Sequence, residues 1–193
     1  MKPSILIVSG VLVVTGVASA IAHGGATGIV KDRMDAMSSM AKVMKSLTAI
    51  MRGDVAYDAE AVRGGANVIK SHAGESMTHL FPEGSGGGAS EAKPEIWSDW
   101  QEFASLSDQL KVFASALGEA ADKGLDQSGA GVGKPGLGTM MGQGGMMGSA
   151  PMMGNTSDMA GSGMLGKMPV QSLFNRVAQT CSACHTKFRI EKK

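Results

Sequence analysis

The chain has 193 residues, of which 43% are hydrophobic, and its 18 basic and 17 acidic side chains give a formal net charge of +1. This length supports one hydrophobic core and no more. Lysines and arginines are dispersed, and only the tail, residues 189–193, is locally basic, so the charge pattern gives no indication of a nucleic-acid partner.

The N-terminal residues have the form of a secretory signal peptide. One lysine precedes an apolar run, residues 5–17, which is short for a membrane span. Small residues then offer cleavage after Ala20 or after Ala22. We expect a signal peptide over residues 1–22 and an exported, periplasmic domain over residues 23–193. An uncleaved membrane anchor is the alternative, and no other segment is predicted to cross a membrane.

Four segments show the 3.6-residue periodicity of amphipathic helices. Thr27 and Asp58 are candidate N-caps of the first two, and Pro94 suits the first turn of the third. Gly53-Asp54 is expected to end the first helix and Phe81-Pro82 the second. The predicted helices are residues 27–51, 58–80, 94–122 and 170–190.

Apolar stripes along these segments predict how the helices pack. The third carries Trp97, Trp100 and Phe103 on its predicted inner face, and the fourth carries Leu173, Val177 and the cysteines. No segment alternates convincingly as a strand. The fold class is therefore predicted to be all-α, an antiparallel four-helix bundle of the kind that often holds a cofactor between facing helices.

A long Gly/Met-rich segment separates the third and fourth helices. Residues 124–169 contain fourteen glycines and nine methionines, and bundle connections rarely exceed about eight residues. We expect a disordered loop, because glycine is entropically costly to order and little branched apolar surface offsets that cost. A tolerated insertion is the simple interpretation. Thioethers also suit Cu(I), so a copper-holding or oxidant-absorbing loop is the alternative.

The most specific motif lies near the C-terminus, where residues 181–185 read C-x-x-C-H. This is the attachment signature of a c-type haem. On a helix, Cys181, Cys184 and His185 project from one face, as attachment to one planar macrocycle requires. A thioredoxin-like redox pair would need a βαβ context, zinc would need four ligands, and a disulfide would not need the histidine. We therefore expect one covalent haem c, with His185 as the proximal axial ligand.

The chain resembles the class II c-type cytochromes, the cytochrome c′ group and its low-spin relatives. The resemblance rests on C-x-x-C-H in the fourth helix followed by Arg189, on residues 30–37 of the first helix, and on residues 93–99 at the entry to the third. It covers about residues 27–122 and 168–193, and it implies a four-helix bundle with one covalent haem. The Gly/Met-rich segment lies outside it.

The resemblance also implies which residue faces the distal side of the haem. This position lies four residues after the first-helix arginine, Arg33, and here it holds Met37. Cytochrome c′ itself has a bulky, non-ligating residue there and leaves iron five-coordinate, whereas the low-spin branch has methionine. Met37 is therefore expected to be the distal axial ligand. A core methionine on a helix stripe is the alternative, and Met34 and Met40 stand nearby.

Further haem contacts are implied by the same resemblance. Arg33 is expected to pair with a haem propionate, although a solvated surface arginine is the alternative. Met34 and Glu91 occupy positions similar to haem-edge contacts, and Arg189 is expected beside the proximal histidine. His72 and His79 lie seven residues apart on the predicted second helix, and neither is assigned to a metal.

The combined expectation is an electron-transfer protein and not an enzyme. Histidine and methionine together fill the axial positions of iron and leave no open site. One alternative is a gas-binding protein of the cytochrome c′ type with five-coordinate iron, and another is a copper-handling protein that uses the Met-rich loop. Partners are expected to be redox proteins of unspecified identity, and the protein is expected to be a monomer or a homodimer.

Overall fold

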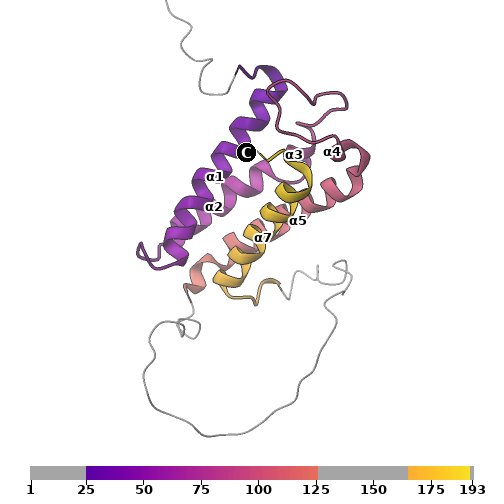
Figure 1. The fold of residues 1–193 in the computed structure, drawn as a ribbon. Coiled ribbons are helices and arrows are strands. Elements are labelled where there is room, and N and C mark those ends of the chain that lie inside the picture. Colours follow the sequence, from indigo (N-terminus) through magenta and orange to yellow (C-terminus); the bar gives the residue numbers. More distant parts are fainter. Residues whose placement is uncertain (1–24, 126–164, 192–193) are drawn as a thin grey trace, which may run out of the picture.

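The computed structural model describes residues 25–125 and 165–191. The four long helices of this part run alternately up and down (Figure 1), which confirms the predicted all-α antiparallel bundle. The elements in chain order are α1 (Gly28–Met51), α2 (Ala59–His72), α3 (Glu75–Thr78), α4 (Glu95–Ser98), α5 (Trp100–Ala120), the 3-10 helix η1 (Ala121–Lys123) and α7 (Val170–Phe188).

Local sequence explains several helix boundaries. The Asp58 carboxylate accepts hydrogen bonds from the backbone N–H groups of Glu60 and Ala61, and so caps α2 as predicted. Thr27 occupies the N-cap position of α1 but makes no side-chain capping bond. Gly53 follows α1 with a φ of +77°, and its N–H bonds the carbonyl of Ile50, so the helix ends where predicted.

The predicted second helix is broken, and the expectation of one continuous helix over residues 58–80 is wrong. Gly74 separates α2 from α3 with a φ of +67°. Its N–H donates to the carbonyl of Ser107 on α5, and the Ser107 hydroxyl donates back to the Gly74 carbonyl, both at 3.1 Å. The periodic apolar pattern continues across the break, but these tertiary bonds and the left-handed glycine interrupt the helix.

The predicted third helix is also divided. Asp99, with φ −113° and ψ 41°, separates α4 from α5. As a result Trp100 is 39% exposed and not directed inward as expected. Phe103, one turn later, is 1% exposed and lies in the core as predicted.

The core is centred on α5, which packs against both α2 and α7, while α1 packs on α2. Leu117, Val62 and Leu173 are fully buried in this centre. By contrast, α1 and α7 make little direct contact. Three of the four neighbouring pairs of long helices are therefore packed against each other, whereas α1 and α7 are not.

The C-terminal end of α7 lies at the end of the bundle that carries α3 and α4 (Figure 1). The predicted signal peptide and nearly all of the predicted Gly/Met-rich loop lie outside the described residues. Among the helices that are described, none combines the length and the apolar character that crossing a bilayer requires.

The break at Gly74 predicts opposite effects of two glycine substitutions. Gly74→Ala should lower the free energy of unfolding by about 1–2 kcal/mol, because alanine is strained at positive φ. The added Cβ would also lie 2.7 Å from Lys111 Cδ. Gly64→Ala, on the exposed face of α2 with no atom within 4 Å, should raise it by about 0.5–1 kcal/mol. Urea denaturation of the purified proteins measures both, and equal effects of the two substitutions would contradict the role given to Gly74.

Candidate functional site

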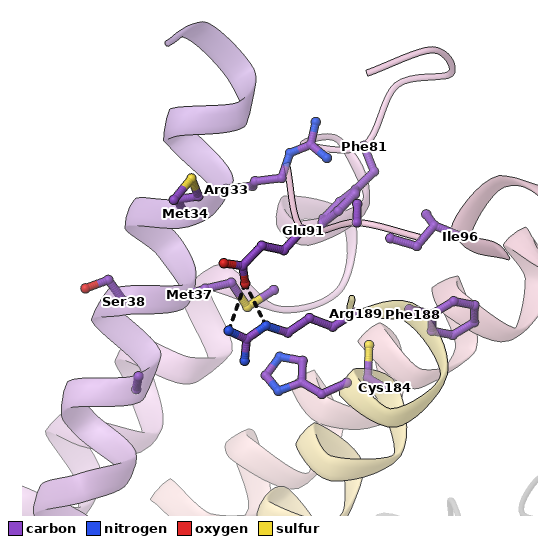
Figure 2. A pocket seen from close by; sticks show the side chains of 13 residues that line it. Arg33, Met34, Met37, Ser38, Phe81, Glu91, Ile96, Cys184, Phe188 and Arg189 are labelled. Carbon is purple, nitrogen blue, oxygen red and sulfur yellow. Dashed lines mark hydrogen bonds and ion pairs between the residues drawn. The ribbon is translucent and has the colours of Figure 1, made fainter. Parts of the chain in front are cut away.

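A cavity of about 350 Å³ opens between α1 and the C-terminal end of α7. This volume is in the range of small-molecule and cofactor sites. Figure 2 shows side chains from α1, from the segment between α3 and α4, and from α7 directed toward one another across it. We call it the α1–α7 cavity, and it is lined by Arg33, Met34, Met37, Ser38, Ala41, Phe81, Glu91, Ala92, Ile96, Cys184, His185, Phe188 and Arg189.

Seven of the eight site residues predicted from the sequence line this cavity, and they come from three separate parts of the chain. The exception is Cys181, which lies one turn before Cys184 on α7 and packs against the core. The seven are Arg33, Met34, Met37, Glu91, Cys184, His185 and Arg189.

The two cysteines are free thiols on one face of α7. Burial raises the pKa of Cys184 to about 11, and the charge of Cys181 adds to this effect. Burial likewise raises the pKa of Cys181. A redox-active C-x-x-C pair needs a depressed pKa so that one thiolate can attack. The pKa values of both thiols are shifted in the opposite direction, which disfavours a thioredoxin-like redox pair.

His185 is exposed and lines the cavity from the last turn of α7. Partial burial lowers its pKa, the positive charge of Arg189 lowers it further, and Glu91 acts in the opposite direction. A lowered pKa keeps the imidazole neutral at physiological pH. Neutral imidazole is the form that coordinates a metal.

Arg189 and Glu91 close the cavity beside His185. Arg189 Nε and Nη2 both lie 2.8 Å from Glu91 Oε2 (Figure 2). The backbones of the two segments are also joined, since Ile190 N–H donates to the Glu91 carbonyl at 2.8 Å and Lys93 N–H to the Phe188 carbonyl at 2.9 Å. The end of α7 is thereby held against the segment that precedes α4.

Arg33 is a buried cation at the opposite wall, with 5% of its surface exposed. Its Nη2 donates to both the carbonyl and the hydroxyl oxygen of Ser85 at 2.8 Å, and its Nη1 to Ser90 Oγ at 3.4 Å. Its guanidinium lies 4.5 Å from the centroid of the Phe81 ring. Arg33 is therefore a buried residue that lines the cavity, and not the solvated surface arginine that was the alternative.

The Nε of Arg33 has no hydrogen-bond partner although it is buried. Burial lowers the pKa of Arg33, and no carboxylate of the described residues forms an ion pair with it. A buried guanidinium with an unpaired donor is costly unless an anionic group completes it. This arrangement fits a ligand that carries carboxylates, as haem does.

The methionines of α1 divide into two groups. Met34 and Met37 line the cavity and are partly exposed to it. Met40 is 6% exposed and belongs to the core, and Met44 packs against the core without lining the cavity. Two thioethers, three residues apart, are therefore available on the α1 wall.

Some lining residues were not singled out from the sequence. Phe81 was read only as a helix terminator, and it lies in the irregular segment after α3. Ile96 was only part of residues 93–99, and it lies in the short helix α4. Phe188 lies within the predicted last helix, but its position at the cavity was not predicted. An apolar residue beside Pro82 or Glu95 gives no periodic signal that would reveal such a role.

The other histidines do not join the site. The break at Gly74 separates His72, which ends α2, from His79, which follows α3, so they do not lie on one helix as expected. Among the described residues no group of three or more histidine, cysteine or acidic side chains could hold a metal ion. The copper alternative concerns methionines of which nearly all lie outside the described residues.

Comparison with known proteins identifies similar chains. The family profile described as Cytochrome C′ matches residues 28–136, which excludes the C-x-x-C-H motif. Cytochrome c-556 of Agrobacterium tumefaciens (strain II Chrys) is 35% identical over 120 residues, 60% of this chain and 91% of that protein. Cytochrome c′ of Alcaligenes xylosoxydans xylosoxydans is 32% identical over 108 residues, 55% of this chain and 83% of that protein.

Solved structures share the fold. A nitric oxide complex of a variant of cytochrome c prime from Alcaligenes xylosoxidans superimposes with a TM-score of 0.55 and 24% identity. The match covers 85% of this chain and 94% of that one. At this identity the likeness extends to the fold alone.

The contacts of Arg33 predict that it holds the segment around residues 85–90 in place. Arg33→Leu should lower the free energy of unfolding by about 1.5–3 kcal/mol, the contribution of a hydrogen bond to a charged group. It should also speed cleavage after Glu83 by a glutamate-specific protease. Arg52→Leu, at an exposed arginine that follows α1, is the matched control and should change neither value. Unchanged cleavage in Arg33→Leu would contradict the anchoring role.

Proposed function

Because the chain belongs to the cytochrome c′ family, we propose that it is an exported electron-transfer protein that carries one haem c. Proteins of this family are haem proteins and not enzymes, and they bind one covalent haem. In this proposal Cys181 and Cys184 attach the haem. His185 and Met37 are its proximal and distal axial ligands.

The proposal is supported chiefly by the side chains on two walls of the α1–α7 cavity, a histidine on one and a methionine on the other. His185 lines it from α7 and Met37 from α1, and these two helices make little contact with each other. An imidazole and a thioether on separate helices, with space between them, are the donor pair of many six-coordinate c-type haems.

Cys181 and Cys184 supply the covalent link. When haem is bound, each thiol would add across one vinyl group: the S–H bond and the vinyl π bond would break, a carbon–sulfur and a carbon–hydrogen bond would form, and no group would leave. Burial raises the pKa of both groups, which favours the thiol form, the form that adds to a vinyl group.

The remaining side chains adjust the site. The bound haem supplies one-electron chemistry through its iron, while the protein sets the polarity around it. Phe81, Ile96 and Phe188 present apolar surface and limit the access of water. Arg33, with its unpaired Nε, is available to a propionate.

Export to the periplasm follows from the signal peptide proposed for residues 1–22, which lie outside the described part of the chain. Covalent haem attachment to the exported domain agrees with this location. The redox partner is a protein whose identity neither the sequence nor the cavity specifies.

One relative favours a second candidate function. A cytochrome c prime from Alcaligenes xylosoxidans is described, in variant form, as a nitric oxide complex, and this chain shares its fold. If Met37 does not ligate iron, the α1 wall of the cavity is where a small gas would bind, and the protein would be a gas-binding haem protein.

Two methionine substitutions test the ligation. Met37→Leu should convert a low-spin ferrous spectrum to a high-spin one that shifts on addition of CO, because the sixth position becomes vacant. Met34→Leu, one turn earlier on the same wall, is the control and should leave the low-spin spectrum unchanged. A wild-type protein that is already high-spin and binds CO would favour the gas-binding candidate. A response of Met34→Leu alone would assign the ligand to Met34.

Mass spectrometry tests the attachment and the processing together. The purified chain should have the mass of residues 21–193 or 23–193 plus one haem, and neither cysteine should react with iodoacetamide after denaturation. Cys184→Ser should retain haem by one thioether only. Two alkylated cysteines in wild-type protein from a host competent in haem attachment would contradict the proposal.

A further inference from the structure

A second depression lies on the outer side of Phe81. It has a volume of about 450 Å³, and we call it the outer groove. Its walls include Pro82, Glu83, Trp97 and Trp100. Phe81 lines both the outer groove and the α1–α7 cavity, and only 6% of its surface is exposed. One buried aromatic ring thus separates the surface from the proposed haem site.

Aromatic contacts join the groove to the cavity by a second route. The Trp100 ring lies 5.6 Å from that of Phe103, which is 1% exposed. Phe103 in turn lies 4.9 Å from Phe81 and 5.6 Å from Phe188, in edge-on arrangements. Both of these phenylalanines line the α1–α7 cavity. Two ring contacts therefore connect the exposed Trp100 to the cavity wall.

Backbone interactions hold the groove in shape. Trp97 Nε1 donates to the carbonyls of Phe81 and Pro82, both at 3.1 Å. The Trp97 ring lies against Gly86, where a Cβ would come within 2.9 Å of it. The ring that forms the groove wall also fixes the backbone that positions Phe81, so the surface is preorganised.

The charge around the groove differs from that of the whole chain. Residues 75–102 contain six acidic side chains and one lysine, whereas the chain as a whole is nearly neutral. Lys187 forms ion pairs with Asp99 and Glu102, and Arg189 pairs with Glu91. Glu83, which lines the groove, and Glu95 form no ion pair with another described residue. The groove is therefore lined by two tryptophans, His79 and the carboxylate of Glu83, in a segment with an excess of acidic side chains.

We propose that the outer groove is the docking surface for a redox protein that presents lysine or arginine side chains beside its own cofactor. The carboxylates attract such a face, and Trp97 and Trp100 accept cationic side chains over their rings. At each encounter one electron would cross between the haem that the α1–α7 cavity is proposed to hold and the cofactor of the partner, so that one is oxidised by one electron as the other is reduced by one. No bond forms or breaks, and no proton is transferred. This inference rests on the proposed electron-transfer function.

Docking is measured without any electron transfer by NMR. The chain has two tryptophans, so the haem-loaded protein gives two indole N–H signals. Addition of a decalysine peptide at low salt should shift the signal of the exposed Trp100, and about 0.5 M salt should reverse the shift. Glu83→Lys should abolish it. Asp54→Lys, which makes the same charge change in the exposed turn after α1, should preserve it. A shift that is equal in both variants, or absent in the wild type, overturns the docking proposal.

Reduction of the ferric protein by hexaammineruthenium(II), a small cation, measures electron entry. Glu83→Lys should slow the second-order reaction about three- to tenfold at low salt, and Asp54→Lys less than twofold, because local potential guides the encounter. Equal rates for all three proteins would show that electrons enter elsewhere, which overturns the groove proposal and leaves the proposed function intact.

If the ferrous wild-type protein binds CO, the proposed function is overturned, and the shifts of the indole signals alone then test the docking surface. If the wild-type protein is a dimer and Trp100→Ala converts it to a monomer, the groove binds a second copy of the chain, and the proposal of a redox partner is overturned.

Discussion

The site depends on one feature of the helix packing: α1 and α7 are neighbours in the bundle but are not packed closely together. In the bundle, α5 packs against α2 and α7, and α1 packs on α2, but α1 and α7 make little contact. Protein interiors are normally close-packed, and a cavity of this size between two helices is typical of a cofactor or ligand site. The residues that face it are an imidazole, a thiol, thioethers, aromatic rings and two arginines, one of them buried. This combination suits an amphipathic, iron-containing macrocycle better than it suits an apolar ligand or a simple ion.

The segment between α3 and α4 gives this cavity its third wall. It contributes Phe81 and Glu91, and it is anchored at one end by Arg33 through Ser85 and at the other by the backbone pairing of Ala92 with Arg189. An irregular segment can follow the curved edge of a cofactor where a helix could not. Its stability therefore depends on side chains of α1 and α7, the two helices that supply the proposed axial ligands. In the proposed function, attachment and ligation of the haem would therefore be coupled to closure of the cavity by this segment.

Local patterns in the sequence predicted most of the fold and one wall of the cavity. The 3.6-residue periodicity located the four long helices, and the C-x-x-C-H spacing located the wall on α7. The opposite wall, with Arg33 and Met37, and the residue Glu91 were indicated only by the resemblance to class II cytochromes. The break at Gly74 could not be predicted, because it depends on hydrogen bonds to Ser107, 33 residues away. The exposure of Trp100 was missed because the periodic pattern predicts one continuous helix, whereas the structure interrupts the helix at Asp99, immediately before Trp100. Phe81 was missed for a similar reason, since its role arises from tertiary packing.

The central claim is that iron is held between a nitrogen of His185 and the sulfur of Met37. X-ray absorption at the iron edge of the purified protein measures this coordination directly. The account predicts one sulfur atom in the first shell together with the four haem nitrogens and one imidazole nitrogen, in both oxidation states. A first shell of five nitrogens with no sulfur would contradict it.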